Sequence, residues 1–281
     1  MKSFLLTLSL FLTIGCTTPR GVAEWGNRES FEGAFYNDPQ MPYLPQGVDQ
    51  CGPAALGMIL GAKGSSQAYE RLVEITMTPA FQGSSTLDLS GAARRMGWLP
   101  VSVVDLEEVI GLTVQGHSPL LLINIGHSLL PQWHYVVVTG FDSRTEMVRL
   151  RSGTFRQLEI PMEELSWRWS PESRWGIVIL SPEESPSGTR RTAYLREAIA
   201  LEKMGKIELA EGAYERAAQY WPLSLTAQMG LANTLARQGK WVGAEKVLRK
   251  AKKQFPLDPR VRHNLNLTVE RLSELGLPSR G

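Results

Sequence analysis

The last third of the chain repeats itself with a period of 34 residues, and this period constrains the fold more than any other feature of the sequence. The equivalent pairs are Ala198 and Ala232, Leu201 and Leu235, Gly205-Lys206 and Gly239-Lys240, Ala210 and Ala244, Ala217 and Ala251, and Trp221-Pro222-Leu223 and Phe255-Pro256-Leu257. A fixed period of this length is typical of stacked structural units, each of which buries its apolar face against its neighbours.

These residues resemble tetratricopeptide repeats, which have small residues where paired helices touch, a glycine in the turn and a proline at the end of each unit. The resemblance implies an all-α domain over residues 191–281, with two repeats and a capping helix near Val261 to Leu275. Because a pair of repeats is only marginally stable alone, we expect this domain to lean on the preceding one or on a partner. We expect it to recruit a protein partner or substrate and assign no chemistry to it.

Charge and composition separate this region from the rest of the chain. From Arg190 onward there are 17 Lys and Arg against 9 Asp and Glu, although the whole chain carries a net charge of only +2. The segment Ser181–Gly188 contains turn formers and no apolar residue, so we place a linker at residues 183–190. The basic surplus indicates a solvated face more readily than a site for an acidic partner or anionic lipid, and we expect no nucleic acid as partner.

The first residues resemble a bacterial export signal. The apolar run Phe4–Ile14 is shorter than the ~20 residues of a spanning helix and ends at Gly15-Cys16. A small residue followed by cysteine resembles the lipobox, in which the cysteine is lipidated and becomes the new N-terminus. The resemblance predicts a signal peptide over residues 1–15, lipidation of Cys16 and a flexible tether over residues 16–40.

The alternative is an ordinary cleaved signal peptide, without acyl chains. Thr17 is not the aspartate that retains enterobacterial lipoproteins in the inner membrane. If Cys16 is lipidated, we therefore expect anchorage to the outer membrane, facing the periplasm.

Two short motifs carry the candidate chemistry. Cys51 stands where a loop becomes a helix, and the unpaired amides and dipole of a helix N-terminus would favour the thiolate. His134 opens a β-branched run, a rigid strand that can hold an imidazole against a thiol. If Cys16 carries lipid, Cys51 is a lone thiol in an oxidising compartment. A small buried hydrophobe at a helix start is the alternative interpretation.

Apolar patterns predict helices first and a sheet second in this part of the chain. We expect helices over residues 52–62, 67–75 and 85–96, and strands over residues 120–125, 135–141, 147–151 and 175–180.

The segments Gln46–Ala54 and His134–Gly140 resemble the papain-like peptidases that cut bacteriocin leaders after paired glycines. The resemblance covers about residues 41–182 and implies an α+β papain-like cysteine peptidase domain (helices, then an antiparallel sheet). It is closest to exported members joined to tetratricopeptide repeats. No phosphate loop of the G-x-x-x-x-G-K-[ST] type is present, so the ATP-driven half of the transporter members is absent.

The resemblance implies roles for three residues. Cys51 matches the nucleophile, His134 the general base and Gln46 the side-chain donor of the oxyanion hole, with the backbone N–H of Cys51 as a second donor. Gln50 competes for the glutamine role, but its adjacency to the nucleophile makes it less able to reach around.

The residue that would orient the catalytic histidine does not match the pattern of the family. Members commonly carry an aspartate on the strand after the histidine strand, and no carboxylate stands in Val148–Thr154. A hairpin turn near residue 143 would pair residues whose numbers sum to about 287 and would place Ser152 and the next residue opposite His134. Asp142 would lie about 26 Å along the strand. We expect Ser152 to orient the imidazole, with a backbone carbonyl as the alternative, and hence modest or absent activity.

Other tempting residues have simpler interpretations. No acidic or cysteine cluster supports a metal site of His117, His127 and His134, so we expect neither metal nor cofactor. Aromatic core packing explains Trp167, Trp169 and Trp175 better than a substrate cleft does, and Glu163 and Glu164 suit a solvated helix start.

The sequence thus predicts a lipid-anchored cysteine peptidase whose repeats recruit a protein partner or substrate. Two other classes stay open. One is a degenerate papain fold retained as a binding module, and the other is a cysteine acyltransferase or amidase that uses the same dyad on a non-peptide amide. No residue indicates the substrate or a cleavage motif.

Overall fold

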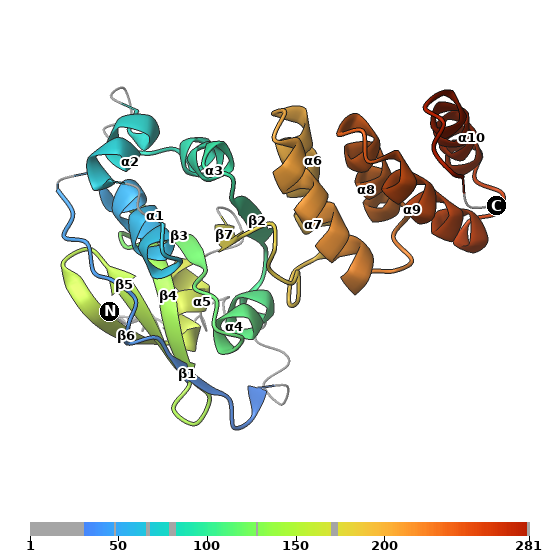
Figure 1. Ribbon diagram of the computed structural model, residues 1–281. Helices are drawn as coiled ribbons and strands as arrows, with labels where there is room; N and C mark the ends of the chain where they lie inside the picture. The colour runs from blue at the N-terminus through green and yellow to red at the C-terminus, as the bar shows by residue number, and fades with distance from the viewer. Residues whose placement is uncertain are drawn as a thin grey trace, which may run out of the picture.

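The computed structural model comprises an α+β region followed by an array of helices (Figure 1). It describes residues 31–47, 49–65, 68–78, 83–127, 129–169 and 174–279. The expected signal peptide, Cys16 and most of the expected tether lie outside the described residues.

The first region contains both helices and strands in an irregular order, whereas the second contains helices alone. In chain order they are β1 (Phe35–Asn37), α1 (Cys51–Ala62), α2 (Tyr69–Thr76), α3 (Thr86–Arg95), β2 (Leu99–Val103), α4 (Leu106–Val114), β3 (Leu120–Asn124), β4 (Trp133–Asp142), β5 (Met147–Ser152), β6 (Phe155–Pro161), α5 (Met162–Arg168), β7 (Trp175–Leu180), α6 (Arg191–Lys203), α7 (Ile207–Tyr220), α8 (Leu225–Arg237), α9 (Trp241–Gln254) and α10 (Pro259–Glu274). The predicted fold class, α+β followed by all-α, is confirmed.

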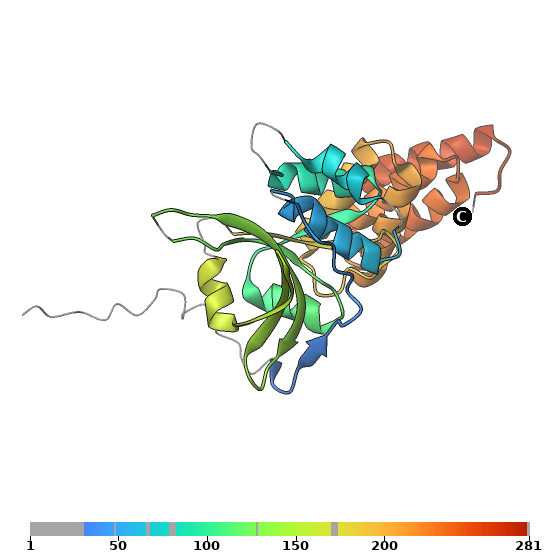
Figure 2. The same cartoon turned by 90° about the vertical axis from the view of Figure 1, so that its left-hand side faces the viewer.

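The strands form one antiparallel sheet in the order β2-β7-β3-β4-β5-β6, with β1 added to the far end of β4. Successive side chains of β4 enter opposite layers, as strand geometry requires. Tyr135 and Val137 belong to the core shared with α1, whereas Val136 and Val138 belong to the core shared with α4. Helices therefore cover both faces of the sheet (Figures 1 and 2).

Helix α1 is buried almost all round. Every residue from Gly52 to Leu60 is buried, which is typical of a central helix and not of an amphipathic surface helix. Gly57 allows this close packing, because a Cβ at that position would lie only 2.8 Å from Leu44 Cδ1. This close packing of α1 fixes its first residue, Cys51, against the sheet.

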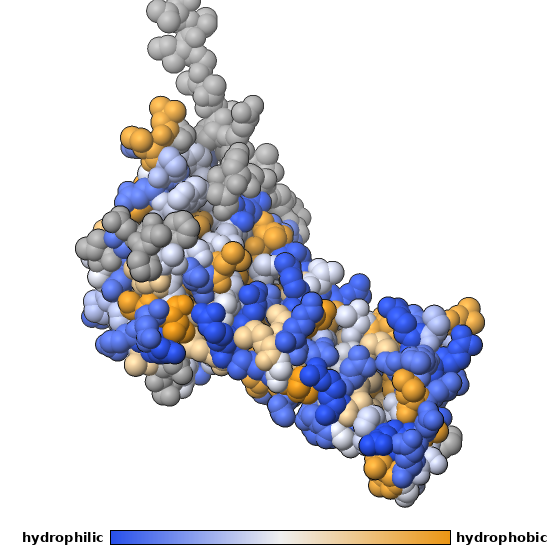
Figure 3. All heavy atoms as spheres, turned by 90° about the horizontal axis from the view of Figure 1, so that it is seen from above, coloured by the Kyte–Doolittle hydropathy of each residue, from blue (hydrophilic) through white to orange (hydrophobic). Residues whose placement is uncertain are grey.

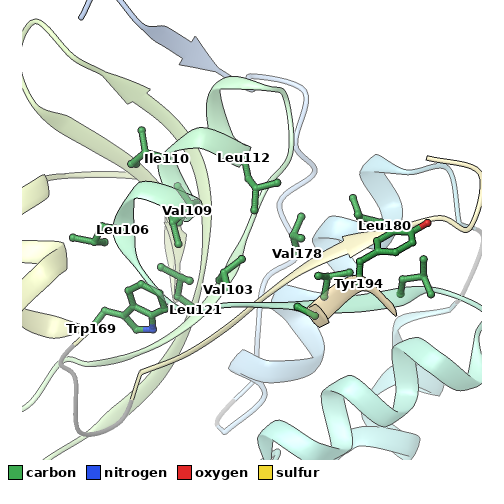
Figure 4. Close-up of a cluster of buried hydrophobic side chains, with 14 of the residues drawn as sticks. Val103, Leu106, Val109, Ile110, Leu112, Leu121, Trp169, Val178, Leu180 and Tyr194 are labelled. Carbon is green, nitrogen blue, oxygen red and sulfur yellow. The ribbon is translucent and has the colours of Figure 1, made fainter. Parts of the chain in front are cut away.

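The core on the other face continues into the helical array. Val109 and Leu112 of α4 and Val178 of β7 share one cluster of buried side chains with Tyr194 of α6 and Tyr214 of α7 (Figure 4, which labels all of these but Tyr214). The helical region therefore leans on the first domain, as expected.

Polar contacts reinforce this junction. Arg94 Nε lies 2.6 Å from Glu197 Oε2, and Glu197 is only 3% exposed. Arg190 donates to the Ser102 carbonyl at 2.8 Å and pairs with Glu108. Seen from above, charged and polar residues cover most of the helical array, while hydrophobic residues lie in separate patches (Figure 3).

The helical array has the predicted repeating plan. Helix pairs α6–α7 and α8–α9 are followed by α10, close to the predicted capping helix. Gly205 and Gly239 occupy equivalent turns with φ of 76° and 75°, a conformation that favours glycine. The repeated alanines are all buried, namely Ala198, Ala210, Ala217, Ala232, Ala244 and Ala251. None of the helices within the described residues is long and apolar enough to cross a membrane.

Candidate active site

Cys51 is the first residue of α1 and is half-buried. The preceding loop is tightly turned, because Asp49 has a φ of 64° and the Gln50 amide donates to the Gly47 carbonyl at 3.3 Å. Gly52 brings this helix start against the segment before α3, since a Cβ there would lie 2.8 Å from Ser84 Cβ. The thiol is thus held between the loop, the sheet and α3.

Burial raises the pKa of the Cys51 thiol, although hydrogen bonds from the backbone amides of Tyr135, Gly52 and Cys51 oppose this effect and the charge of Asp49 adds to it. The amides at the helix start thus lower the pKa as predicted, but burial outweighs them and the net shift is upward, opposite to the expected one. Desolvation of the charged form outweighs the amides that face it. The effect of the Tyr135 backbone N–H on this pKa also indicates that the sulfur lies beside the start of β4.

His134 is the second residue of β4 and is half-buried, with its backbone paired to Ile123 of β3. Burial lowers the pKa of its imidazole. Both shifts favour a neutral thiol and a neutral imidazole at pH 7. Among the described residues, no hydrogen bond joins the Cys51 sulfur to the His134 ring.

The turn after β5 brings His134 and Gln46 together. A Cβ placed on Gly153 would lie 3.7 Å from His134 Nε2 and 3.5 Å from Gln46 Nε2, so both nitrogens face one point at this corner. Gly153 has a φ of 58°. Gln46 and His134 thus face the same corner, and the influence of the Tyr135 amide places the Cys51 sulfur near the residue that follows His134 on β4.

Gln50 is engaged elsewhere. Its Oε1 accepts hydrogen bonds from the Tyr69 hydroxyl at 3.1 Å and from the Gly47 amide at 3.3 Å. These contacts close the loop on itself and tie it to α2. The geometry favours Gln46 over Gln50 at the site, because Gln46 Nε2 faces the corner that His134 also faces, whereas the Gln50 side chain is turned toward Gly47 and Tyr69.

Ser152 does not meet the expectation placed on it. The β4–β5 pairs sum to 288 and, beyond an irregularity between Val138 and Gly140, to 289, close to the predicted 287. The ladder ends at Val137 and Arg151, before His134. Ser152 is buried and pairs with Phe155, and within the described residues its hydroxyl makes no hydrogen bond to the imidazole. The glycine beside it, Gly153, lies at the corner that His134 faces.

The remaining sequence candidates lie outside the site. Asp142 is at the opposite end of β4, paired with Phe35 and Met147, as expected. His127 is exposed on the β3–β4 hairpin, and the described residues contain no group of three or more His, Cys, Asp and Glu suited to a metal ion.

Three tryptophans have different environments. Trp169 is fully buried and donates to the Trp175 carbonyl at 2.9 Å, and Trp175 packs edge-on against Tyr135 with ring centroids 5.6 Å apart. Core packing is therefore confirmed for these two, whereas Trp167 is 48% exposed. Glu163 and Glu164 lie in the first turn of α5, as expected.

Sequence reasoning missed the contacts that fix Gln46. The Tyr43 hydroxyl donates to the Gly153 carbonyl at 3.3 Å, the Arg156 guanidinium lies 4.8 Å from the Tyr43 ring centroid, and Arg151 donates to the Met41 carbonyl at 3.0 Å. These bonds clamp the segment before Gln46 to the β5–β6 hairpin. They join residues about 110 positions apart, so no local pattern signals them.

Comparison with known proteins supports the resemblance of the repeats. A family model for tetratricopeptide repeats matches residues 195–259. No curated protein matches the chain. The structure is similar to the peptidase domain of Streptococcus ComA, a bifunctional ABC transporter involved in a quorum sensing pathway, with 22% identity, coverage of 50% of this chain and 97% of that chain, and a TM-score of 0.39.

Two further structures are similar. A C39-like peptidase from Bacillus anthracis has 16% identity, covers 52% of this chain and 97% of its own and has a TM-score of 0.43. A double glycine motif protease from an AMS/PCAT transporter, in complex with its leader peptide, has 22% identity, coverage of 51% and 92%, and a TM-score of 0.38. At these values the similarity concerns the fold alone.

Proposed function

We propose that this protein is a cysteine peptidase in which Cys51 is the nucleophile, His134 the general base and Gln46 a donor to the oxyanion. The observation that carries the proposal is that Gln46 and His134 face one point beside Gly153, while the Cys51 sulfur lies near the amide of Tyr135, the residue that follows His134 on β4. Apposition of a thiol, an imidazole and an amide donor is what acyl transfer requires.

The reaction starts from the neutral pair. As the Cys51 sulfur attacks the carbonyl carbon of the substrate amide, its proton passes to His134, and the negative charge that develops on the carbonyl oxygen is met by Gln46 and the Cys51 amide. His134 returns the proton to the leaving amine when the C–N bond breaks. Water, deprotonated by His134, then hydrolyses the thioester and frees Cys51.

The test uses the chain from Thr17 onward, in which Cys51 is the only cysteine. Incubation with p-nitrophenyl acetate should acetylate Cys51, as measured by intact mass and peptide mapping. Loss of the base in His134→Ala should slow acetylation by about 10²-fold or more. Equal acetylation of both proteins would contradict the assignment of His134.

A degenerate binding module is the second candidate, and one observation favours it. No side chain within the described residues hydrogen-bonds the His134 ring, so nothing in that part of the chain holds the imidazole in one tautomer. A Cys51 that alkylates but never acylates would support this candidate. A cysteine acyltransferase or amidase shares the same dyad, and transfer to an added amine would distinguish it.

We also propose that the repeats recruit a protein partner or substrate. A groove of about 480 Å³ among α8, α9 and α10 supports this, since its lining combines apolar side chains with polar and charged ones, namely Asn233, Asn264, Thr268, Glu270, Arg271 and Glu274. Polar groups over an apolar floor suit a peptide segment.

Anchorage through lipid on Cys16, in the outer membrane and facing the periplasm, completes the proposal. It rests on the sequence alone. Mass spectrometry of membrane-extracted protein should find acyl chains on Cys16, and Cys16→Ser should release the protein from membranes.

A further inference from the structure

Among the described residues of the first domain, the most exposed large apolar side chain is Leu129, at the turn of the hairpin between β3 and β4. Leu129 and Leu130 are 91% and 78% exposed, and Ile125 and Trp133 lower on the hairpin are 40% and 44% exposed. Residues 124–133 include no Asp, Glu, Lys or Arg, although these types make up 21% of the chain. The hairpin extends beyond the body of the domain (Figure 2). An uncharged projection with this much apolar surface is a binding feature.

Most backbone amides among the described residues of this hairpin are bonded within it. The amides of Ile125, His127 and Leu130 donate to carbonyls within the hairpin at 2.8 to 3.2 Å. Asn124 Oδ1 accepts from two more amides, those of Gly126 and Gln132, at 2.9 Å each. Pro131 has no N–H, so among the described residues of 125–132 only Leu129 keeps an amide without a partner. Backbone amides that are already bonded can enter the interior of a lipid bilayer at lower cost, because the bilayer interior offers no hydrogen-bond partners.

The shape of the hairpin indicates which occupant it fits. A peptide that added a strand would need a row of free amides, and those of the hairpin are already bonded. A peptide groove would need walls, whereas the two leucines stand on a convex turn and are almost fully exposed. A lipid bilayer requires only an apolar projection without charge, and a tryptophan at its base suits the membrane–water interface.

The segment between Cys16 and the first described residue is long enough to allow this docking. The described residues begin at Phe31, and the 14 residues that separate Phe31 from Cys16 could span about 50 Å when extended. A lipid on Cys16 would therefore leave the domain free to approach the membrane surface.

We propose that the β3–β4 hairpin docks on a lipid bilayer, with Leu129 and Leu130 inserted among the acyl chains and Trp133 at the interface. Because Trp133 directly precedes His134, docking holds the candidate site at the membrane surface, where it meets amides of membrane-bound proteins or lipid-linked substrates. This consequence for the substrate rests on the proposed function, whereas the docking itself does not.

The test uses the chain from Thr17 onward, which lacks Cys16 and retains every residue that the structure describes. Flotation with vesicles of phosphatidylethanolamine and phosphatidylglycerol compares the wild type with the double variant Leu129→Glu, Leu130→Glu. The matched control is Leu223→Glu, Leu257→Glu, which alters leucines that are 70% and 88% exposed on the repeats. Circular dichroism confirms that each protein is folded.

We expect the wild type and the control to float and the hairpin variant to bind at least about tenfold more weakly, because two leucines lose their transfer into lipid. Failure of the wild type to float, or equal flotation of both variants, would overturn the proposal. Dimerisation that depends on Leu129 and Leu130 without flotation would also overturn it, because a second copy would then be the occupant. Acetylation of Cys51, measured in parallel, reports on the proposed function separately.

Discussion

The two regions of this protein differ in how far apart in the sequence the residues lie that determine their structure. In the helical array each unit packs on its neighbours, so a local period of 34 residues specifies the helices, turns and buried alanines. In the first domain the candidate site is assembled from α1, β4 and the β5–β6 turn, and its contacts join residues about 110 positions apart. In this domain, motifs identify the candidate residues in the sequence, but only the topology of the fold determines where they lie in space.

The largest predicted effect lies in the repeats. Gly230 of α8 packs flat on Tyr214, and a Cβ there would lie less than 2.7 Å from three ring atoms. Because Tyr214 is fixed by its hydroxyl bond to Glu202, Gly230→Ala should destabilise the protein by about 3 kcal/mol through overpacking. Gly243→Ala is the control, since its Cβ would meet Leu235 at an ordinary 3.6 Å.

Thermal unfolding measures this prediction. Since Tyr214 belongs to the core that continues into the first domain, we expect a single transition at a lower temperature. Two separate transitions would show that the two regions do not share a cooperative core.

A smaller effect is expected at the junction of the two regions. Arg94→Ala would leave Glu197, which is 3% exposed, without its guanidinium partner. We expect a loss of about 2 kcal/mol in the free energy of unfolding, less than for a fully buried pair because Arg94 reaches solvent. Arg271→Ala breaks an exposed pair with Glu274 and should change stability by no more than about 0.5 kcal/mol. Equal effects of the two variants in urea denaturation would contradict this account.

The loop before Cys51 offers a third test. Tyr69→Phe removes the hydroxyl that donates to Gln50 and leaves the ring in place. Loss of one hydrogen bond, about 1 kcal/mol, should slow acetylation of Cys51 by about fivefold. Alkylation by iodoacetamide, which develops no oxyanion, should be unchanged. Tyr220→Phe, on an exposed tyrosine of α7, is the control.

The smallest effect concerns the charge beside the thiol. Asp49 raises the pKa of Cys51, so Asp49→Asn should lower that pKa and increase the thiolate fraction at pH 7. Alkylation should accelerate by roughly twofold, because Asp49 is exposed and its charge is screened. Asparagine tolerates the positive φ at this position. The rates should converge at high pH, and Glu74→Gln on α2 should behave as the wild type; a slower Asp49→Asn reaction would contradict the sign of the shift.

Most elements of the first domain were predictable from the sequence. Helices α1, α2 and α3 and strands β3, β4, β5 and β7 lie within two residues of their expected bounds. Strand β2 was not expected, because it contains Pro100, which it tolerates as an edge strand. Strand β6, the opposite edge, was not expected either, because its side chains are mostly exposed and lack a clear alternation.

The elements that carry the candidate residues were predictable from the sequence, but the pKa of the thiol was not. His134 and Gln46 face one point beside Gly153, and the Cys51 sulfur lies near the Tyr135 amide, because each residue lies within or beside a strongly specified element. The expected low pKa of Cys51 was wrong because burial depends on α3 and β4, which no local pattern reports. The expected role of Ser152 depended on a ladder that ends before His134.

The most direct test of the central claim compares two reactions of the same thiol. Gln46→Ala should lower the rate of Cys51 acetylation by p-nitrophenyl acetate by about 10²-fold, the effect of losing one oxyanion donor, and should leave the rate of alkylation by iodoacetamide within about twofold. That result would show that Gln46 acts on the oxyanion and not on the thiol. If both rates fell together, or neither changed, the assignment of Gln46, Cys51 and His134 to one acyl-transfer site would be contradicted.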